Sequence, residues 1–177
     1  MHCCCFVFET VYHTHKDIVF NLALQYVQNV EDAQEITQDV FLSVYQSLSS
    51  FRQEAHITTW IYRITINKSL DFIRTKKRKK RFAFMVNLFA DESRESLHKA
   101  AFDHPGIQLE QKEALERIFR HINDLPERQR TALILSKIEQ LPQATIAAIM
   151  QLSVKAVESL IQRAKNNLAN KLDTEGK

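Results

Sequence analysis

Apolar side chains recur at spacings of three and four residues along most of the chain, which is typical of helices with one buried face. The first stripe predicts a helix from Phe6 to Gln28. A second helix is expected from Asp32 to about Leu48, because Asp32 followed by Glu35 resembles a capping box. The positions predicted to face inward are Phe8, Val11, Tyr12, His15, Val19, Leu22 and Tyr26 in the first helix, and Ala33, Ile36, Val40, Val44 and Leu48 in the second.

Residues 49–58 break this pattern and are predicted to form a loop. A third helix, capped by Thr58 or Thr59, then runs from Trp60 into Arg74–Arg81, where seven of eight residues are basic. Basic side chains suit the C-terminal end of a helix, but seven exceed what the helix dipole requires. The apolar side of this helix consists of Ile61, Ile64, Ile66, Leu70 and Ile73, and a polar stripe consists of Arg63, Asn67, Asp71 and Arg74.

The helical periodicity fades over residues 82–107, which end in the breaker cluster DHPG and are predicted to link two domains. Limited digestion of the free protein is expected to cut this linker and leave two folded fragments. Its large apolar residues are too many for a simple tether, so we expect something to cover Phe82, Phe84, Met85, Leu88 and Phe89.

A second helical unit is predicted from Gln108 onward. Pro126 and Pro142 each suit the first residue of a helix, and Ser153 suits the cap of the last one. The short helix after Pro142 and the final helix, joined by a tight turn, form a helix-turn-helix pattern. Such a pair is either a DNA-binding motif or only a packing unit, and the pattern alone leaves both interpretations open.

The composition agrees with an all-α protein made of two small helical domains, residues 1–81 and 108–177. Only two glycines and three prolines occur among 177 residues. No apolar run approaches the ~20 residues that a membrane-spanning helix needs, and the start lacks the pattern of an export signal. We therefore expect a cytoplasmic protein without membrane insertion.

Positive charge is concentrated in one short segment of the chain. Residues 1–50 hold one Lys or Arg and six acids, a net charge of −5, whereas residues 51–81 hold ten basic and two acidic residues, a net charge of +8. A concentrated basic segment is typical of a nucleic-acid site. The acidic neighbour suggests a second surface for a basic partner.

No catalytic or metal-binding arrangement is evident in the sequence. Cys3, Cys4 and Cys5 are consecutive, so they cannot easily share one tetrahedral zinc, and no second Cys or His cluster completes a site. There is also no Ser/His/Asp arrangement or phosphate-binding loop. We therefore expect no enzymatic activity, no metal and no cofactor.

Two long blocks resemble a known family. The block DAQEITQDVFLSVYQSLSSFRQEAHITTWIYRITINKSLDFIRTKKRKKR resembles the second conserved region of bacterial sigma factors. The block LPERQRTALILSKIEQLPQATIAAIMQLSVKAVESLIQRAKNNL resembles their fourth region. Their order and the short linker are similar to the extracytoplasmic-function (ECF) class. The resemblance implies a subunit that binds core RNA polymerase, recognises the −10 and −35 promoter elements and promotes DNA melting.

The resemblance also implies partners and residues for the first block. The outward face of the second helix would bind the β′ clamp helices of the polymerase through Glu35, Gln38 and Asp39, with Phe41 alongside. The loop after it and the third helix would bind the single-stranded −10 element, with Asn67 reading a base that has left the stack. Trp60 either stacks on bases or packs in the core. The residues implied for the −10 element are Phe51, Arg52, His56, Trp60, Arg63, Asn67, Lys68, Arg74, Lys76 and Lys77.

For the second block, the resemblance implies binding to the polymerase β flap and insertion of Ser153–Lys165 into the major groove of the −35 element. The implied contacts are Lys155, Glu158, Ser159, Gln162, Arg163 and Lys165. Gln151 replaces the turn glycine usual in the family, at a cost on the order of 1 kcal/mol if the turn needs a positive φ. An anti-sigma factor is a further implied partner. The main alternative is a helix-turn-helix transcriptional regulator with a helical sensing domain.

Overall fold

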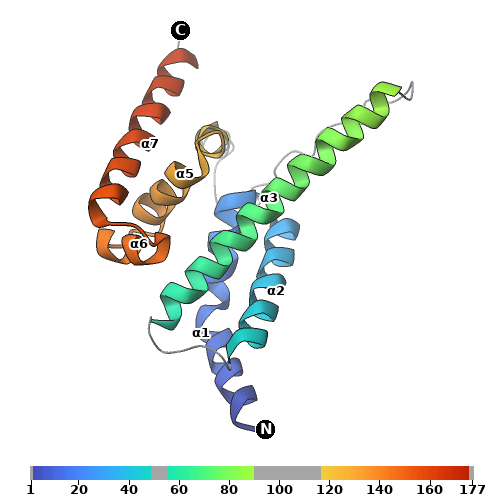
Figure 1. The fold of residues 1–177 in the computed structure, drawn as a ribbon, viewed down its shortest axis with the longest axis vertical. Coiled ribbons are helices and arrows are strands. Elements are labelled where there is room, and N and C mark those ends of the chain that lie inside the picture. The colour runs from blue at the N-terminus through green and yellow to red at the C-terminus, as the bar shows by residue number, and fades with distance from the viewer. Residues whose placement is uncertain (1, 49–55, 90–116, 176–177) are drawn as a thin grey trace, which may run out of the picture.

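The computed structural model describes residues 2–48, 56–89 and 117–175, and within them the side chains of residues 8–48, 56–82 and 117–172. In this part of the chain every regular element is a helix, which confirms the prediction of an all-α protein. Figure 1 shows an N-terminal unit of three helices beside a second helical unit at the C-terminal end.

The N-terminal unit consists of α1 (His2–Val27), α2 (Val30–Ser47) and the first half of α3 (Ile57–Phe89). All three pairs of these helices pack against each other, because each presents one apolar stripe. Most positions predicted to face inward are buried, although Tyr12 is 38% exposed and its ring lies against that of Phe41. The core of this unit includes Val11, Val19, Ala23, Ala33, Ile36, Val40, Phe41, Val44 and Ile61.

Two predicted helix starts were wrong by a few residues. The N-cap of α2 is Asn29, not Asp32, because the Asn29 side-chain oxygen accepts a hydrogen bond of 2.8 Å from the Asp32 backbone amide. This places Asp32 inside the first turn, where a carboxylate suits the helix dipole. The third helix begins at Ile57, before Thr58, and the His56 carbonyl accepts from the Trp60 amide at 3.2 Å.

Helix α3 is longer than predicted, since it continues through the basic segment and into the expected linker as far as Phe89. At ~1.5 Å per residue its 33 residues span roughly 50 Å. Figure 1 shows its far end projecting away from the rest of the molecule. Phe82, which we expected to be covered, is 66% exposed, whereas the side chains of Phe84, Met85, Leu88 and Phe89 lie outside the described residues.

In the C-terminal unit, residues 117–123 are helical and are followed by α5 (Glu127–Leu133), a π-helical turn η2 (Ile134–Ile138), α6 (Gln143–Met150) and α7 (Val154–Glu175). Pro126 and Pro142 were predicted to be the first residues of helices. They are instead the N-caps of α5 and α6, so each helix begins one residue later than predicted. The Ser153 hydroxyl accepts from the Ala156 amide at 3.2 Å, so the predicted cap of the last helix is confirmed. The π-helical turn was not predicted.

The turn between α6 and α7 has the strained geometry that the sequence suggested. Gln151 ends α6 in the left-handed region, with φ 55° and ψ 45°. Glycine is favoured there because it lacks a Cβ atom.

No single described helix has the length and apolar character needed to cross a membrane. The one pair of described helices that meets both requirements together, α6 with Val154–Leu172, is bent by 98°.

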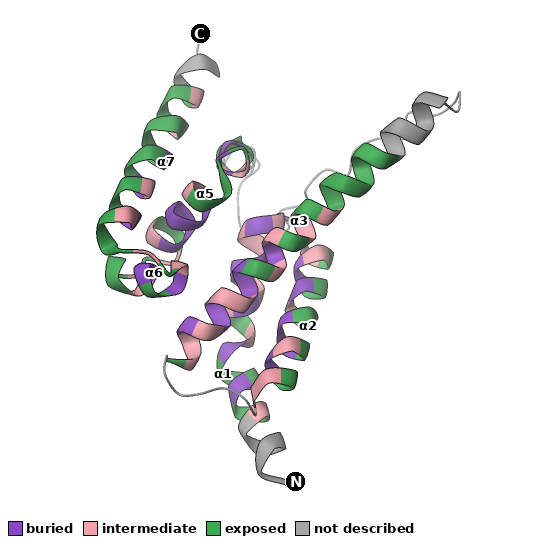
Figure 2. Ribbon diagram, in the orientation of Figure 1, coloured by how far each residue is buried: buried purple, intermediate pink, exposed green. Residues whose placement is uncertain are grey.

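The two units pack against each other through part of their apolar side chains. Leu22, Tyr26, Tyr62 and Ile66 of the N-terminal unit belong to the same buried cluster as the core of the C-terminal unit. Figure 2 shows buried positions on α3, α5 and α6. The predicted helix-turn-helix core is part of this cluster and includes Ile146, Ala147, Ile149, Val157 and Ile161. The result of limited digestion stays a prediction.

His15 provides a test of the N-terminal core. It is only 7% exposed, and its Nδ1 atom has no hydrogen-bond partner among the described residues. Burial lowers the pKa of His15 because the charged imidazole loses hydration. The unfolded chain therefore takes up a proton at higher pH than the folded chain, and this linkage reduces stability as the pH falls below the ordinary pKa of 6.5.

We expect the unfolding free energy, measured in urea at pH 8 and pH 5, to fall less in His15→Leu than in the wild type. His13→Leu is the control, because His13 is an exposed histidine of the same helix. An equal loss of stability in the wild type and His15→Leu would contradict the role assigned to His15.

Candidate nucleic-acid interface

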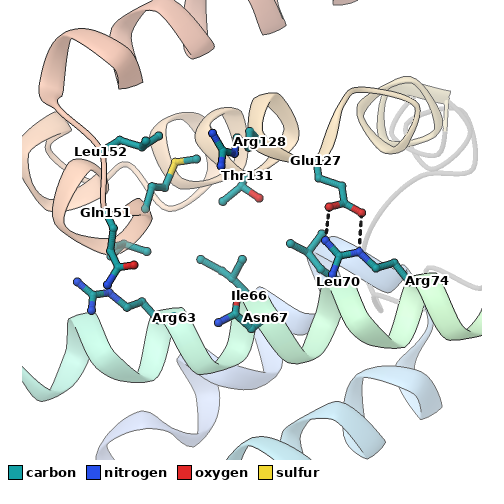
Figure 3. A pocket seen from close by; sticks show the side chains of 12 residues that line it. Arg63, Ile66, Asn67, Leu70, Arg74, Glu127, Arg128, Thr131, Gln151 and Leu152 are labelled. Carbon is teal, nitrogen blue, oxygen red and sulfur yellow. Dashed lines mark hydrogen bonds and ion pairs between the residues drawn. The ribbon is translucent and has the colours of Figure 1, made fainter.

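The polar stripe of α3 lies on the side that faces the C-terminal unit, and Asn67, Asp71 and Arg74 stay exposed there. Figure 3 shows Arg63, Asn67 and Arg74 directed from α3 toward the turn after α6 and the start of α5. A cavity of about 250 Å³ lies between them. Its lining residues are Arg63, Ile66, Asn67, Leu70, Arg74, Glu127, Arg128, Thr131, Ile149, Met150, Gln151 and Leu152.

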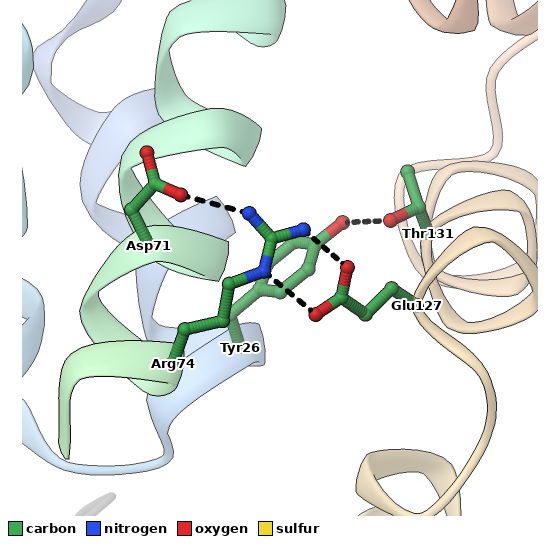
Figure 4. Close-up of polar contacts among 5 residues, drawn as sticks. All are labelled: Tyr26, Asp71, Arg74, Glu127 and Thr131. Atoms are coloured by element: carbon green, nitrogen blue, oxygen red, sulfur yellow. Dashed lines mark hydrogen bonds and ion pairs between the residues drawn. The ribbon is translucent and has the colours of Figure 1, made fainter. Parts of the chain in front are cut away.

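The two arginines at the ends of this stripe bind the C-terminal unit. Arg63 donates through Nη2 to the Ala148 carbonyl oxygen at 2.6 Å. Arg74 donates to both carboxylate oxygens of Glu127, with an Nε–Oε1 distance of 3.0 Å, and to Asp71 at 2.9 Å (Figure 4). The hydrogen bonds from Arg74 lower the pKa of the Glu127 carboxyl. Both guanidinium groups are therefore engaged by the protein in this arrangement.

Asn67 lies between these arginines along the same side of α3. Its side chain is exposed to the cavity and makes no hydrogen bond with another described residue. A free amide can donate and accept at the edge of a base, which is the requirement for reading an unstacked nucleotide.

Buried polar contacts join the two units beside the stripe. The Tyr26 hydroxyl donates to Thr131 Oγ1 at 2.9 Å (Figure 4). Glu139 accepts twice, from Gln25 Nε2 at 2.6 Å and from the Tyr62 hydroxyl at 2.8 Å. Burial raises the pKa of Tyr26 to about 12, and burial followed by the hydrogen bond to Glu139 raises the pKa of Tyr62. Both tyrosines therefore stay protonated at neutral pH and can donate.

The basic segment is helical and mostly solvent-exposed. Lys77 through Arg81 are all exposed, and no described acid pairs with them. Lys76 differs, because it forms an ion pair with Asp32 and lies 5.7 Å from the centre of the Phe72 ring. Lys68 is half-buried. The segment thus presents several cations along one helix, while Lys76 also ties α3 to α2.

Trp60 and His56 lie at the start of α3. Trp60 is partly buried against the N-terminal core, and His56 is exposed. Tyr62 is 6% exposed and belongs to the buried cluster that includes residues of both units. Phe51 and Arg52, which were also expected near the −10 element, lie outside the described residues.

The acidic surface of α2 agrees with the pattern except at one position. Glu35, Gln38 and Asp39 are exposed. Phe41 is only 5% exposed and packs edge-on against Phe8 and Tyr12, so it lies on the buried side of α2. It precedes the buried Val44 by three residues, a spacing that places two side chains on the same face of a helix. Its role beside the polymerase-binding acids stays a prediction.

The helix-turn-helix presents the first turns of α7 to solvent. All six residues implied for the −35 element are exposed, namely Lys155, Glu158, Ser159, Gln162, Arg163 and Lys165. The Gln162 side chain donates a hydrogen bond of 3.0 Å to the side-chain oxygen of Asn166. The candidates on α7 are thus accessible, while Arg63, Asn67 and Arg74 on α3 face the C-terminal unit.

Sequence reasoning missed the residues that hold the two units together. Glu139 lies 114 positions from Gln25 and 77 from Tyr62, and Thr131 lies 105 positions from Tyr26. Arg130 is 3% exposed and lies 5.2 Å from the Tyr26 ring centre. Arg130 alone gave a usable signal, since it belongs to the apolar side of its helix, between Pro126 and Leu133.

The described residues contain no candidate metal-binding site. No three His, Cys, Asp or Glu side chains gather there in a way that could hold an ion. Cys3, Cys4 and Cys5 lie in the first turns of α1, and their side chains are outside the described part.

Comparison with known proteins identifies the family. Two family models match in order, Sigma-70 region 2 over residues 11–79 and Sigma-70, region 4 over residues 115–168. The ECF RNA polymerase sigma-E factor of Escherichia coli is 30% identical over 162 residues, which cover 92% of this chain and 83% of that protein. The chain is an ECF sigma factor.

A second relative agrees with this assignment. The ECF RNA polymerase sigma-E factor of Haemophilus influenzae is 29% identical over 165 residues, or 93% of this chain and 87% of that protein. As an ECF sigma factor, the protein acts in transcription initiation and is not an enzyme. The alternative of a helix-turn-helix regulator with a sensing domain is set aside, because region 2 occupies the place of that domain.

Solved structures share the fold of this sigma factor across both regions. CnrH in complex with the cytosolic domain of CnrY has a TM-score of 0.66 at 23% identity, covering 94% of this chain and 88% of that one. The sigma factor RpoE in complex with the anti-sigma factor NepR from Bartonella quintana has a TM-score of 0.62 at 19% identity, covering 94% and 96%.

Proposed function

We propose that this sigma factor reads the −10 element with the polar stripe of α3 and the basic segment that follows it. The observation that carries the proposal is the position of Asn67, an unbonded amide between Arg63 and Arg74 on a helix that continues into exposed lysines. Phosphate contacts hold a nucleic acid and base contacts specify its sequence. Asn67 supplies the second kind of contact, and the arginines and lysines supply the first.

Region 4 must leave α3 before this reading can occur. Arg63 bonds to Ala148 and Arg74 bonds to Glu127 in the described arrangement, so DNA phosphates would have to replace both region 4 partners. The exchange conserves charge-assisted bonds, because a phosphate oxygen can take the place of the carbonyl or the carboxylate. We therefore assign this arrangement to a state that does not read the −10 element.

The experiment that tests this function is transcription by purified core polymerase. The sigma factor should direct initiation from a cognate promoter, and Asn67→Ala should reduce open-complex formation there by roughly tenfold, because one base contact contributes ~1–3 kcal/mol of discrimination. At a promoter altered at the flipped base, the same variant should lose much less. Equal losses at both promoters would show that Asn67 does not read a base.

For the −35 element we propose major-groove recognition by α7. Glu158, Ser159, Gln162 and Arg163 are the base-facing candidates, while Lys155 and Lys165 suit phosphates. Glu158 can accept a hydrogen bond from cytosine N4, which favours a cytosine in the target sequence. Region 4 is also proposed to bind the β flap of the polymerase.

We propose that Glu35, Gln38 and Asp39 bind the β′ clamp helices of the core enzyme. They lie on α2, which Figure 1 shows on the opposite side of α3 from α6. Reversing both charges, in Glu35→Lys/Asp39→Lys, should weaken core-polymerase binding by about tenfold or more. A loss of this size is expected because close charge pairs at protein interfaces contribute at least that much to affinity. Helicity should be unchanged, because both side chains are exposed.

A matched control for that variant is Asp17→Lys/Glu31→Lys, which makes the same change in net charge at two other exposed acids. Affinity for core polymerase is measured by competition with a labelled sigma factor. If the control variant loses as much affinity as the test variant, Glu35 and Asp39 affect polymerase binding only through the overall charge of the protein.

A protein partner that restrains this sigma factor is also proposed. The two structural neighbours were solved with the cytosolic domain of CnrY and with the anti-sigma factor NepR. An anti-sigma factor of this chain is expected to favour the arrangement in which region 4 covers α3.

Because promoter recognition requires the polymerase and the chromosome, we place the protein in the bacterial cytoplasm.

A further inference from the structure

We propose that a small phosphate-bearing anion binds between region 2 and region 4, in a cavity beside Arg130. The cavity has a volume of about 330 Å³, within the range of ~300–1,000 Å³ usual for small-molecule sites. It is distinct from the cavity at Asn67, with which it shares no lining residue. Its lining residues are Tyr26, Val27, Asp32, Phe72, Ile73, Lys76, Lys77, Lys80, Asn123 and Arg130.

Arg130 is a buried cation that makes no hydrogen bond or ion pair with a carboxylate among the described residues, although the charge of Glu127 is close enough to act on it. It is 3% exposed, and its Nε atom has no hydrogen-bond partner in the described part of the chain. Nη1 makes one long hydrogen bond of 3.3 Å to the Asn123 side-chain oxygen, and the Tyr26 ring lies 5.2 Å away. Burial lowers the pKa of this guanidinium because the charged form loses hydration.

Such an arrangement is costly in the absence of an anion. A guanidinium removed from water needs a partner of opposite charge and further hydrogen bonds, or its desolvation is uncompensated. The nearest candidate within region 4, Glu127, already holds both of its oxygens against Arg74. An anion in the cavity would supply the partner that Arg130 lacks.

The rest of the lining favours phosphate over a single carboxylate. Lys77 and Lys80 are exposed ammonium groups on α3, and no described acid pairs with them. Lys76 already pairs with Asp32, the only carboxylate among the described lining residues. Arg130, Lys77 and Lys80 are thus three cations that line the cavity without an ion-paired acid among the described residues. A phosphate group, with several acceptor oxygens and more than one charge, can engage a guanidinium fork and two ammonium groups together.

The cavity exists only while the two regions are packed together, because Arg130 and Asn123 belong to region 4 and the lysines to α3. A ligand that binds this arrangement alone shifts the protein toward it by its differential affinity. The anion would therefore stabilise the state in which region 4 covers α3. This inference does not depend on which residues read promoter DNA.

The test uses inorganic pyrophosphate as the probe and isothermal titration calorimetry on the full chain. We expect Lys77→Ala/Lys80→Ala to weaken pyrophosphate binding by roughly three- to thirtyfold, since two exposed cations that face the anion are removed. The matched control is Arg78→Ala/Lys79→Ala, which removes the same charge from exposed neighbours that do not line the cavity. The control should bind pyrophosphate within about twofold of the wild type.

Arg130→Met tests the buried cation itself. Methionine approximates the length of arginine without its charge, so the variant should bind pyrophosphate at least roughly tenfold more weakly, as expected for losing a hydrogen bond to a charged group. In thermal melts, pyrophosphate should raise the midpoint of the wild type but not of Arg130→Met. Small-angle X-ray scattering of the wild type should show no expansion when pyrophosphate is added.

Three results would overturn the proposal. Absence of binding at millimolar pyrophosphate would do so, as would equal weakening by the two double variants, which indicates only nonspecific attraction to the basic helix. Expansion of the protein on adding pyrophosphate would show that the anion binds α3 in competition with region 4. If Arg130→Met fails to fold, the two double variants still decide the matter.

Discussion

Replacing Thr131 and Glu139 together by arginine should move region 4 off α3 without altering any residue of α3. The Tyr26 hydroxyl loses its acceptor at Thr131, and Gln25 and Tyr62 lose theirs at Glu139. Each arginine would add a buried cation facing donors, which costs several kcal/mol unless the two regions separate and water reaches it. We expect the radius of gyration from small-angle scattering to rise while the helical circular dichroism signal is kept.

The same variant should bind a single-stranded −10 oligonucleotide roughly tenfold or more tightly, because apparent affinity scales with the fraction of molecules whose reading face is uncovered. Ile138→Arg is the control, since it introduces a cation at an exposed position next to Glu139. A variant as compact as the wild type, with unchanged affinity for the oligonucleotide, would show that these buried contacts do not hold region 4 in place.

Replacing Lys76, Lys77, Lys79 and Lys80 by alanine should produce the second large effect. All four side chains are exposed along α3, and each can neutralise a DNA phosphate. With four fewer contacts, the slope of log affinity against log salt for a single-stranded −10 oligonucleotide should become shallower by roughly 3, at ~0.7 per phosphate. Affinity at low salt should fall by a similar factor for every sequence, since phosphate contacts carry no sequence information.

This pattern separates the lysines from Asn67, whose loss should depend on sequence and leave the salt slope unchanged. Lys16→Ala/Lys137→Ala serves as a control for net charge, because neither lysine belongs to α3. An unchanged salt slope in the quadruple variant would mean that the basic segment is only a solvated helix end.

Local features of the fold were well predicted from the sequence. The apolar stripes located every long helix, and Ser153, Pro126 and Pro142 marked helix starts to within a residue. Capping and periodicity act over a few residues, so a single sequence contains the information they require. The residues implied for the −35 element are accessible on α7 for the same reason, because their helical spacing determines which side they occupy.

The packing of region 4 on region 2 could not be predicted in this way. It depends on pairs such as Tyr26 with Thr131 and Gln25 with Glu139, which are 105 and 114 positions apart. A polar stripe on a helix has the same pattern whether it faces water, nucleic acid or another domain. The stripe was therefore correctly located on α3, but its neighbour in the free protein was not.

The π-helical turn η2 has a consequence for how relatives of this chain should be aligned. Its bonds run over five residues, as in the contact of 3.0 Å from the Glu139 amide to the Ile134 carbonyl, so the turn holds one residue more than an α-helical turn would. An unbroken α-helix here would reach the following turn with one residue fewer and would present a different residue to Tyr62. A relative with one residue fewer in this turn is therefore expected to lack a carboxylate in the position from which Glu139 accepts the Tyr62 hydrogen bond.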